Sequence, residues 1–170
     1  MGIVAPRKNQ QFLITVADRL WEEGLPFELH IVGRVNPHFG EPVAKDIKAM
    51  TTRRPGLRFH EGASDGTFAE LLARARAVVF LTIAEGCGLP VLESLWRGLP
   101  SVCSDLPVLR ENTHEGGWVL LPTNDLTGWS DGLKRVLFDD ERWRGLADVA
   151  AQRNLPTWAE RAREVRRELG

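Results

Sequence analysis

Short apolar runs alternate along the chain with amphipathic stretches, and this alternation constrains the fold more than any other feature. The run AVVFL at 77–81 is continuously apolar and rich in β-branched residues, as expected of a strand buried on both faces of a parallel sheet. The stretches at 11–24 and 68–76 carry apolar residues at helical spacing instead. This order of elements predicts an α/β protein whose parallel strands are joined by helical crossovers.

The remaining elements follow from the same patterns. We expect strands at 2–5, 27–33, 57–60, 77–81, 101–105 and 117–121, and helices at 11–24, 41–50, 68–76, 126–138, 141–152 and 158–169. Gly24 is the expected C-cap of the first helix, and Ser64 or Asp65 the N-cap of the third. With 170 residues, of which 43% are hydrophobic, the chain suffices for one well-formed core, so we treat 1–170 as one domain.

Composition excludes several classes of function. The 22 basic residues nearly balance the 23 acidic ones, so no charge excess recruits nucleic acid or an anionic membrane. The cysteines and histidines match no metal or redox spacing and form no cluster in the sequence: Cys87, Cys103, His30, His38, His60 and His114. No apolar run is long enough for a bilayer and the N-terminus lacks a signal-peptide pattern, so we expect a reduced, cytosolic protein.

The stretch AEGCGLPVLES at 84–94 lies where ligands bind in open parallel sheets, directly after the best strand. Gly86 and Gly88 allow positive φ and a close backbone approach, and Pro90 fits a first helical turn because its missing N–H is not needed there. The free amides and the helix dipole would then favour an anion such as phosphate.

Two carboxylates flank this turn, and they narrow the choice of anion. Glu85 and Glu93 would repel bare phosphate, whereas sugar hydroxyls can donate to them. The pattern suits a diphosphate with a sugar at each end, a nucleoside diphosphate sugar. An ordinary strand-to-helix turn, with glutamates favoured by the dipole alone, stays open as the alternative. The dinucleotide motif fails because Val91 stands where a third glycine is needed, and no P-loop occurs.

EGCGLPVLES resembles the motif of two glutamates separated by seven residues in retaining GT-B glycosyltransferases. Further segments resemble that family in the correct order, and they cover almost the whole chain: GIVAPRKNQ, LHIVG, LRFHEGASDGTFAELLARARAVVFLT, RGLPSVCSDLPVLRE and LPTWAERAREV. The resemblance implies a Rossmann-like, doubly wound parallel sheet, namely the C-terminal, nucleotide-sugar-binding half of a GT-B enzyme without its N-terminal acceptor domain.

The resemblance also implies roles for the charged residues. Lys8 and Arg7 would contact the diphosphate, with Arg7 in place of the arginine that the family commonly has where Ile3 stands here. Glu93 would hold both ribose hydroxyls. Glu85 would face the donor sugar and stabilise positive charge at its anomeric carbon.

Small residues and backbone groups complete the implied site. The amides of Gly88 and Leu89 would hold the distal phosphate, and Gly33 would let the backbone approach the pyrophosphate. Cys87 would be a small side chain near the sugar. Ser64 and Asp65 lie where relatives line the base, although a helix N-cap explains them equally well.

The resulting hypothesis is metal-independent hexosyl transfer with retention, because cations and amides can neutralise the leaving diphosphate without a metal or other cofactor. The donor would be a UDP-, GDP- or ADP-sugar. The PRKN stretch at 6–9 resembles that of mannosyl-type transferases. The isolated domain would be inactive. Contact with the inner membrane would come through the N-terminal domain. Two alternatives stay open: a stand-alone nucleotide-sugar-binding module, regulatory or paired with a separate subunit, and a relative that epimerises sugar nucleotides.

Overall fold

The computed structural model describes residues 2–111 and 116–170, so His114 lies outside the described residues. Helices and strands alternate along most of this chain, as the sequence predicts. In chain order the elements are η1 (Pro6–Lys8), α1 (Gln10–Glu22), β1 (Leu29–Val32), α2 (Glu41–Arg53), β2 (Leu57–His60), α3 (Asp65–Arg74), β3 (Val78–Phe80), α4 (Leu89–Trp96), β4 (Ser101–Ser104), α5 (Pro107–Arg110), β5 (Trp118–Leu121), α6 (Leu126–Phe138), α7 (Asp140–Gln152) and α8 (Trp158–Leu169).

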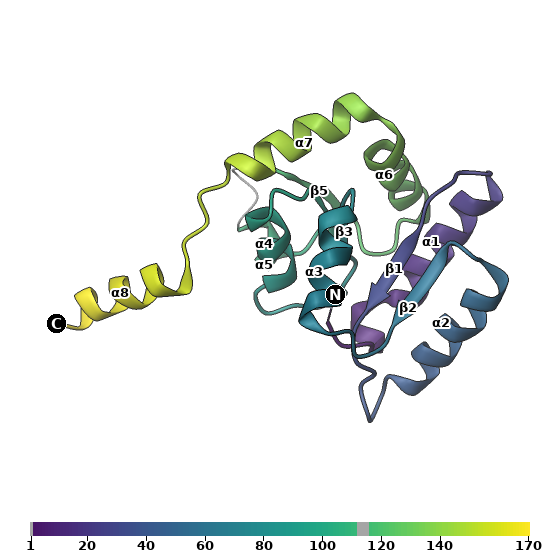
Figure 1. The fold of residues 1–170 in the computed structure, drawn as a ribbon, viewed down its shortest axis with the longest axis horizontal. Coiled ribbons are helices and arrows are strands. Elements are labelled where there is room, and N and C mark those ends of the chain that lie inside the picture. The colour runs from purple at the N-terminus through teal and green to yellow at the C-terminus, as the bar shows by residue number, and fades with distance from the viewer. Residues whose placement is uncertain (1, 112–115) are drawn as a thin grey trace.

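All strand pairs are parallel, which confirms the expected α/β class, but the strands form two separate sheets. One sheet contains β1 and β2, with Leu29 opposite Leu57 and Val32 opposite His60. The other has the order β3-β4-β5, with Val78 opposite Ser101. Figure 1 shows β1 and β2 beside each other, with α1 and α2 next to them.

The predicted first strand at 2–5 is wrong. Its only ladder contact among the described residues is an isolated parallel bridge between Val4 and Val35. The chain then turns into the 3-10 helix η1 at Pro6. A short apolar run predicts that a segment is extended, but a strand also needs a neighbour along its length, and 2–5 has a neighbour at one position.

Helices α1 and α6 hold the two sheets together. Their apolar faces share one core cluster, in which Val16 and Leu20 of α1 meet Trp129 and Leu133 of α6. Leu29 of β1 and Val79 of β3 both pack against this cluster, although their strands do not pair. Trp129 is fully buried and its indole N–H donates to the Pro122 carbonyl at 2.7 Å, which satisfies its polar group.

The helix boundaries follow the local signals closely. Ser64 is the N-cap of α3, where its hydroxyl accepts from the Thr67 amide at 3.1 Å, as expected. Gly24 lies just past the end of α1 with φ +79°, a conformation that favours glycine. Two short helices, η1 and α5, were not expected, and both begin at a proline.

Helix α8 extends away from the rest of the molecule (Figure 1). It contains no buried residue, and a capping box between Thr157 and Glu160 begins it. Its arginine-rich surface is therefore exposed along the whole helix. Within 2–111 and 116–170, no helix combines the length and apolarity needed to cross a membrane.

Candidate functional site

The candidate site lies where the carboxyl end of β3 contacts the N-terminal segment of the chain. The Arg7 carbonyl accepts from the Ile83 amide at 3.0 Å and from the Thr82 hydroxyl at 3.1 Å. Thr82 is fully buried and also donates to the Ala84 carbonyl at 2.9 Å. These bonds fix the η1 turn beside the loop that follows β3, at the edge where ligands bind in parallel sheets.

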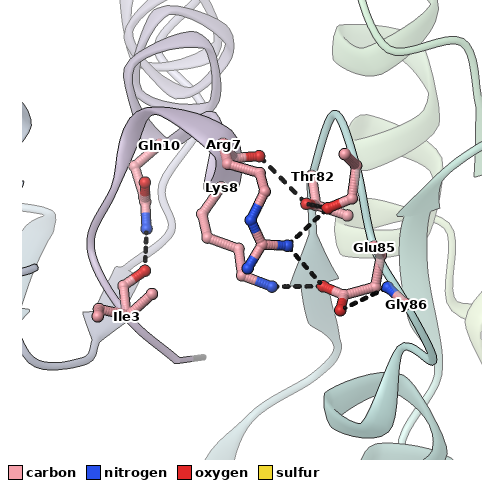
Figure 2. A network of polar contacts seen from close by, with 8 residues as sticks. Ile3, Arg7, Lys8, Gln10, Thr82, Glu85 and Gly86 are labelled. Carbon is pink, nitrogen blue, oxygen red and sulfur yellow. Dashed lines mark hydrogen bonds and ion pairs between the residues drawn. The ribbon is translucent and has the colours of Figure 1, made fainter. Parts of the chain in front are cut away.

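The Glu85 carboxylate forms ion pairs with both cationic side chains of that turn, Arg7 and Lys8, as Figure 2 shows. Its Oε2 atom lies 2.5 Å from Lys8 Nζ and 3.5 Å from Arg7 Nη1. Arg7 Nη1 also donates to the Ala84 carbonyl at 2.7 Å. The side chains of Lys8 and Glu85 are only 12% and 15% exposed, whereas that of Arg7 is 49% exposed. The sequence predicted these three residues as site residues but did not predict that they pair with one another.

The electrostatics of this cluster favour an ionised Glu85. Burial raises the pKa of its carboxyl, but hydrogen bonds from Lys8 and the Gly86 amide and the nearby positive charges outweigh burial, so the pKa is lowered. Lys8 Nζ also lies 4.6 Å from the centroid of the Phe80 ring, a cation–π contact. The ammonium is therefore held between a ring and a carboxylate.

The loop after Glu85 leads into α4 through a conformation that only glycine adopts readily. Gly88 is the N-cap of α4 with φ +77°, and a Cβ there would lie 2.3 Å from Leu109 Cδ2. Gly86 has no positive φ, and a Cβ there would meet no atom within 4 Å. The expected left-handed backbone is therefore present at Gly88 and not at Gly86.

The N-terminus of α4 presents backbone donors. No side chain caps it, and Pro90 occupies the first turn, as the sequence predicts. The Leu89 amide has no acceptor among the described residues and Leu89 is exposed, so the positive end of the helix dipole keeps an unused donor four residues after Glu85. Such a terminus can bind an anion.

The other predicted site residues surround this loop unevenly. Glu93 lies in the second turn of α4 and Cys87 in the loop, and both are exposed. Gly33 lies against the N-terminal segment, since a Cβ at this position would be 1.7 Å from the Gly2 carbonyl oxygen. Ser64 and Asp65 begin α3, where Ser64 already serves as a cap.

The structure also forms a histidine pair that the sequence analysis did not expect. His30 Nδ1 and His60 Nε2 are 3.0 Å apart across the β1–β2 ladder, and His30 Nε2 lies 3.2 Å from Glu28. Burial, with a contribution from His30 and Arg58, lowers the pKa of His60. Residues 30 and 60 are far apart in sequence, and only the strand register brings them together. Among the described residues, no three His, Cys, Asp or Glu side chains form a group suited to a metal ion.

A parallel α/β fold with two cations and a helix N-terminus near its strand ends is an arrangement that can bind an anion. The family model for glycosyl transferases group 1 matches residues 1–139. The chain therefore belongs to this glycosyltransferase family.

Two relatives agree with that family. The chain is 31% identical over 118 residues to a serotype-specific mannosyltransferase, WbdA, of Escherichia coli, covering 69% of this chain and 14% of the relative. It is 31% identical over 148 residues to the O-antigen chain mannosyltransferase B of Escherichia coli, covering 86% of this chain and 38% of that relative. The chain thus spans a minor part of each of these relatives.

Solved structures share the fold at low sequence identity. Sucrose-phosphate synthase from Thermosynechococcus elongatus superposes with a TM-score of 0.80 at 20% identity, over 99% of this chain and 45% of that one. The C-terminal domain of a glycosyl transferase group 1 family protein (LpcC) from Francisella tularensis superposes with a TM-score of 0.77 at 16% identity, over 89% of this chain and 80% of that one. Anabaena Alr3699/HepE in complex with UDP superposes with a TM-score of 0.74 at 19% identity, over 88% of this chain and 42% of that one.

Proposed function

We propose that this chain is the donor-binding, C-terminal domain of a GT-B glycosyltransferase, and that the cluster of Arg7, Lys8 and Glu85 beside α4 receives a nucleoside diphosphate sugar. One observation carries the proposal: two cations and a helix N-terminus with a free Leu89 amide converge at the carboxyl end of β3. Oxygens of a diphosphate match both kinds of donor.

Glu85 prepares the site before the ligand enters. Its ion pair with Lys8 holds the ammonium in place at 2.5 Å, and a diphosphate competes with the carboxylate for that ammonium. Once Lys8 turns to phosphate, the Glu85 carboxylate is free to accept from a hydroxyl of the donor sugar and to stabilise positive charge at the anomeric carbon. Lys8 and Arg7 then stabilise the leaving diphosphate.

The remaining predicted residues take places around the two ends of the donor. Glu93, exposed in the second turn of α4, binds the ribose hydroxyls, while Gly88 and Leu89 hold the distal phosphate through their amides. Gly33 lets the backbone approach the pyrophosphate, and Cys87 lies near the sugar. Ser64 and Asp65 belong to the base side.

The transferred sugar in this proposal is mannose, because both of the relatives described above are mannosyltransferases. A guanine nucleotide is the first candidate for the donor, on the ground of the mannosyl-type PRKN stretch, ahead of UDP and ADP. Transfer proceeds with retention and without a metal, since cations and amides neutralise the leaving group. An N-terminal domain supplies the acceptor side, so the chain alone binds donor but does not transfer it.

Calorimetric titration of the chain with GDP, UDP and ADP, each with and without EDTA, tests the proposal. We expect saturable binding of at least one nucleotide, unchanged by EDTA. Absence of binding for all three would overturn donor binding, and loss of binding in EDTA would overturn metal independence.

A further inference from the structure

Glu28, His30 and His60 form a chain of three side chains across the β1–β2 ladder, outside the proposed diphosphate site. His60 Nε2 lies 3.0 Å from His30 Nδ1, and His30 Nε2 lies 3.2 Å from Glu28 Oε2. The two ring planes differ by 10° and the ring centroids are 5.1 Å apart. Because the facing nitrogens are much closer than the ring centres, the rings meet edge to edge, as in an N–H···N hydrogen bond.

Strand register places this histidine pair at the carboxyl end of β2. His30 is opposite Arg58 and His60 is opposite Val32, so the two rings are diagonal neighbours on one face of the sheet. His60 is the last residue of β2, and its carbonyl accepts from the Gly33 amide at 3.2 Å. The contact between the rings therefore acts directly on the end of the ladder.

Donor and acceptor counting fixes the tautomers of the neutral pair. A carboxylate can only accept, so His30 Nε2 carries its hydrogen and donates to Glu28, which leaves His30 Nδ1 as an acceptor. His60 must then donate from Nε2, and its Nδ1 has no hydrogen. Glu28 suits this role, because the hydrogen bond from His30 lowers the pKa of its carboxyl and favours the ionised form.

Added protons change the contact in two stages. With one added proton, a facing nitrogen can still lack a hydrogen, so the two rings can still share a hydrogen bond. With two added protons, both facing nitrogens carry hydrogens, and two positive rings face each other across 3.0 Å. The contact is then repulsive, because like charges repel and neither nitrogen can accept.

The surroundings of His60 favour its neutral ring. Burial, with contributions from His30 and Arg58, lowers the pKa of His60 from its ordinary value of 6.5. The unfolded chain therefore binds this proton more readily than the folded chain does. The stability that the neutral ring contributes is complete above pH 6.5 and is lost as the pH falls below that value.

Charged side chains of the neighbouring elements flank the pair. Arg58 of β2 lies 3.8 Å from Glu28, and Arg74 of α3 also acts on Glu28. On the α2 side, Lys48 pairs at 3.2 Å with Glu61, the residue after His60. Arginine stays charged throughout, and Glu28 is ionised well below neutral pH, so a charge change between about pH 7 and pH 5 belongs to the rings.

We propose that Glu28, His30 and His60 form an acid-sensitive contact that holds the carboxyl ends of β1 and β2 together and releases them when both rings are protonated. Release frees the Gly33 amide from the His60 carbonyl. It also loosens the segment 61–64, which connects β2 to the N-cap of α3. This pH response does not depend on donor binding, because none of the three residues belongs to the proposed diphosphate site.

NMR of the wild-type chain tests the contact itself. A coupling between His60 Nε2 and His30 Nδ1 across the hydrogen bond should be observable at about pH 8, where both rings are neutral. The coupling should vanish at the pH at which the second ring becomes charged. Absence of the coupling at about pH 8, or its persistence after both rings are charged, would overturn the proposal.

Amide hydrogen exchange tests the release. The Gly33 amide is compared with the Val78 amide, which donates to the Pro100 carbonyl in the other sheet at 2.9 Å, so that the general effect of pH on exchange cancels. From about pH 7 to pH 5, the protection of Gly33 relative to Val78 should fall at least about tenfold in the wild type. It should stay constant in His60→Gln, whose side chain takes up no proton.

His38→Gln is the matched control, because His38 is exposed and lies outside the pair. This variant should show the same fall in protection as the wild type. Constant protection of Gly33 in the wild type would overturn the proposal, and an undiminished fall in His60→Gln would assign the pH response to another group. The coupling in the wild type decides the case even if His60→Gln fails to fold.

Discussion

Lys8 Nζ and Glu85 Oε2 lie 2.5 Å apart although 77 residues separate them in the sequence. The pair joins the turn at the start of the chain to the loop between β3 and α4. Both side chains are mostly buried, so solvent screens their interaction less than that of a surface pair. The pair therefore links these two segments of the chain and forms part of the proposed diphosphate site.

Replacing Glu85 by Gln should make stability depend less on pH. The pKa of Glu85 lies below its ordinary value of 4.5, so its contribution is present above that value and is lost as the pH falls through the folded-state pKa. Urea unfolding of the wild type and Glu85→Gln should differ at pH 7 and converge below about pH 4.5. The exposed Glu141→Gln is the control. A wild-type advantage that stays constant down to pH 3 would contradict an ionised Glu85.

Lys8→Ala should weaken nucleoside diphosphate binding by about 1.5 to 3 kcal/mol, the usual contribution of a hydrogen bond to a charged group. Lys45 on α2 is exposed and offers a matched control, so Lys45→Ala should leave the dissociation constant unchanged. Calorimetry at two salt concentrations measures both variants. Equal affinities for the Lys8 variant and the wild type would remove Lys8 from the site.

Gly88→Ala should destabilise the fold by about 1 to 3 kcal/mol, because the new Cβ would combine a left-handed backbone with a close approach to the buried Leu109. Gly86→Ala, two residues away, should change stability by less than about 0.5 kcal/mol, since its Cβ enters open space. Thermal unfolding of the two variants tests the difference. A Gly86 variant as unstable as the Gly88 variant would refute this account of the loop.

Glu93→Ala should weaken binding of the bare nucleotide by about 2 kcal/mol through lost ribose bonds. Glu85→Ala should not weaken binding of the bare nucleotide, because it removes a carboxylate that competes with the diphosphate for Lys8, and it should weaken only binding of the sugar-bearing donor. Titrations with GDP and with the corresponding sugar nucleotide separate the two effects. If both variants lose affinity for the nucleotide equally, the assigned roles of the two glutamates are wrong.

The sequence predicts most elements of this fold because the local signals are strong. The continuous apolar run at 77–81 becomes β3, and Ser64 caps α3, each from information within a few residues. The error at 2–5 has a different cause. Pairing depends on a neighbour distant in sequence, and the apolar character of Val4 carries no information about what lies beside it.

The candidate site shows the same division. The motif at 84–94 indicates Glu85, Gly88 and the start of α4 without any structure. Two contacts depend on strand order and register: Lys8 with Glu85, and His30 with His60. Local sequence patterns do not specify strand order or register. One signal for the site was overlooked: Thr82 is the polar residue within an otherwise apolar run, and its hydroxyl binds the Arg7 carbonyl.

The most direct test of the central claim follows backbone amides by NMR while GDP, UDP or ADP is added. If the N-terminus of α4 and the cluster of Arg7, Lys8 and Glu85 hold the diphosphate, the amide chemical shifts of Gly88 and Leu89 should change saturably. The dissociation constant from these changes should equal the one that calorimetry gives, and the amide of Val165 on α8 should not shift. Binding heat without any shift at Gly88 and Leu89 would contradict the claim.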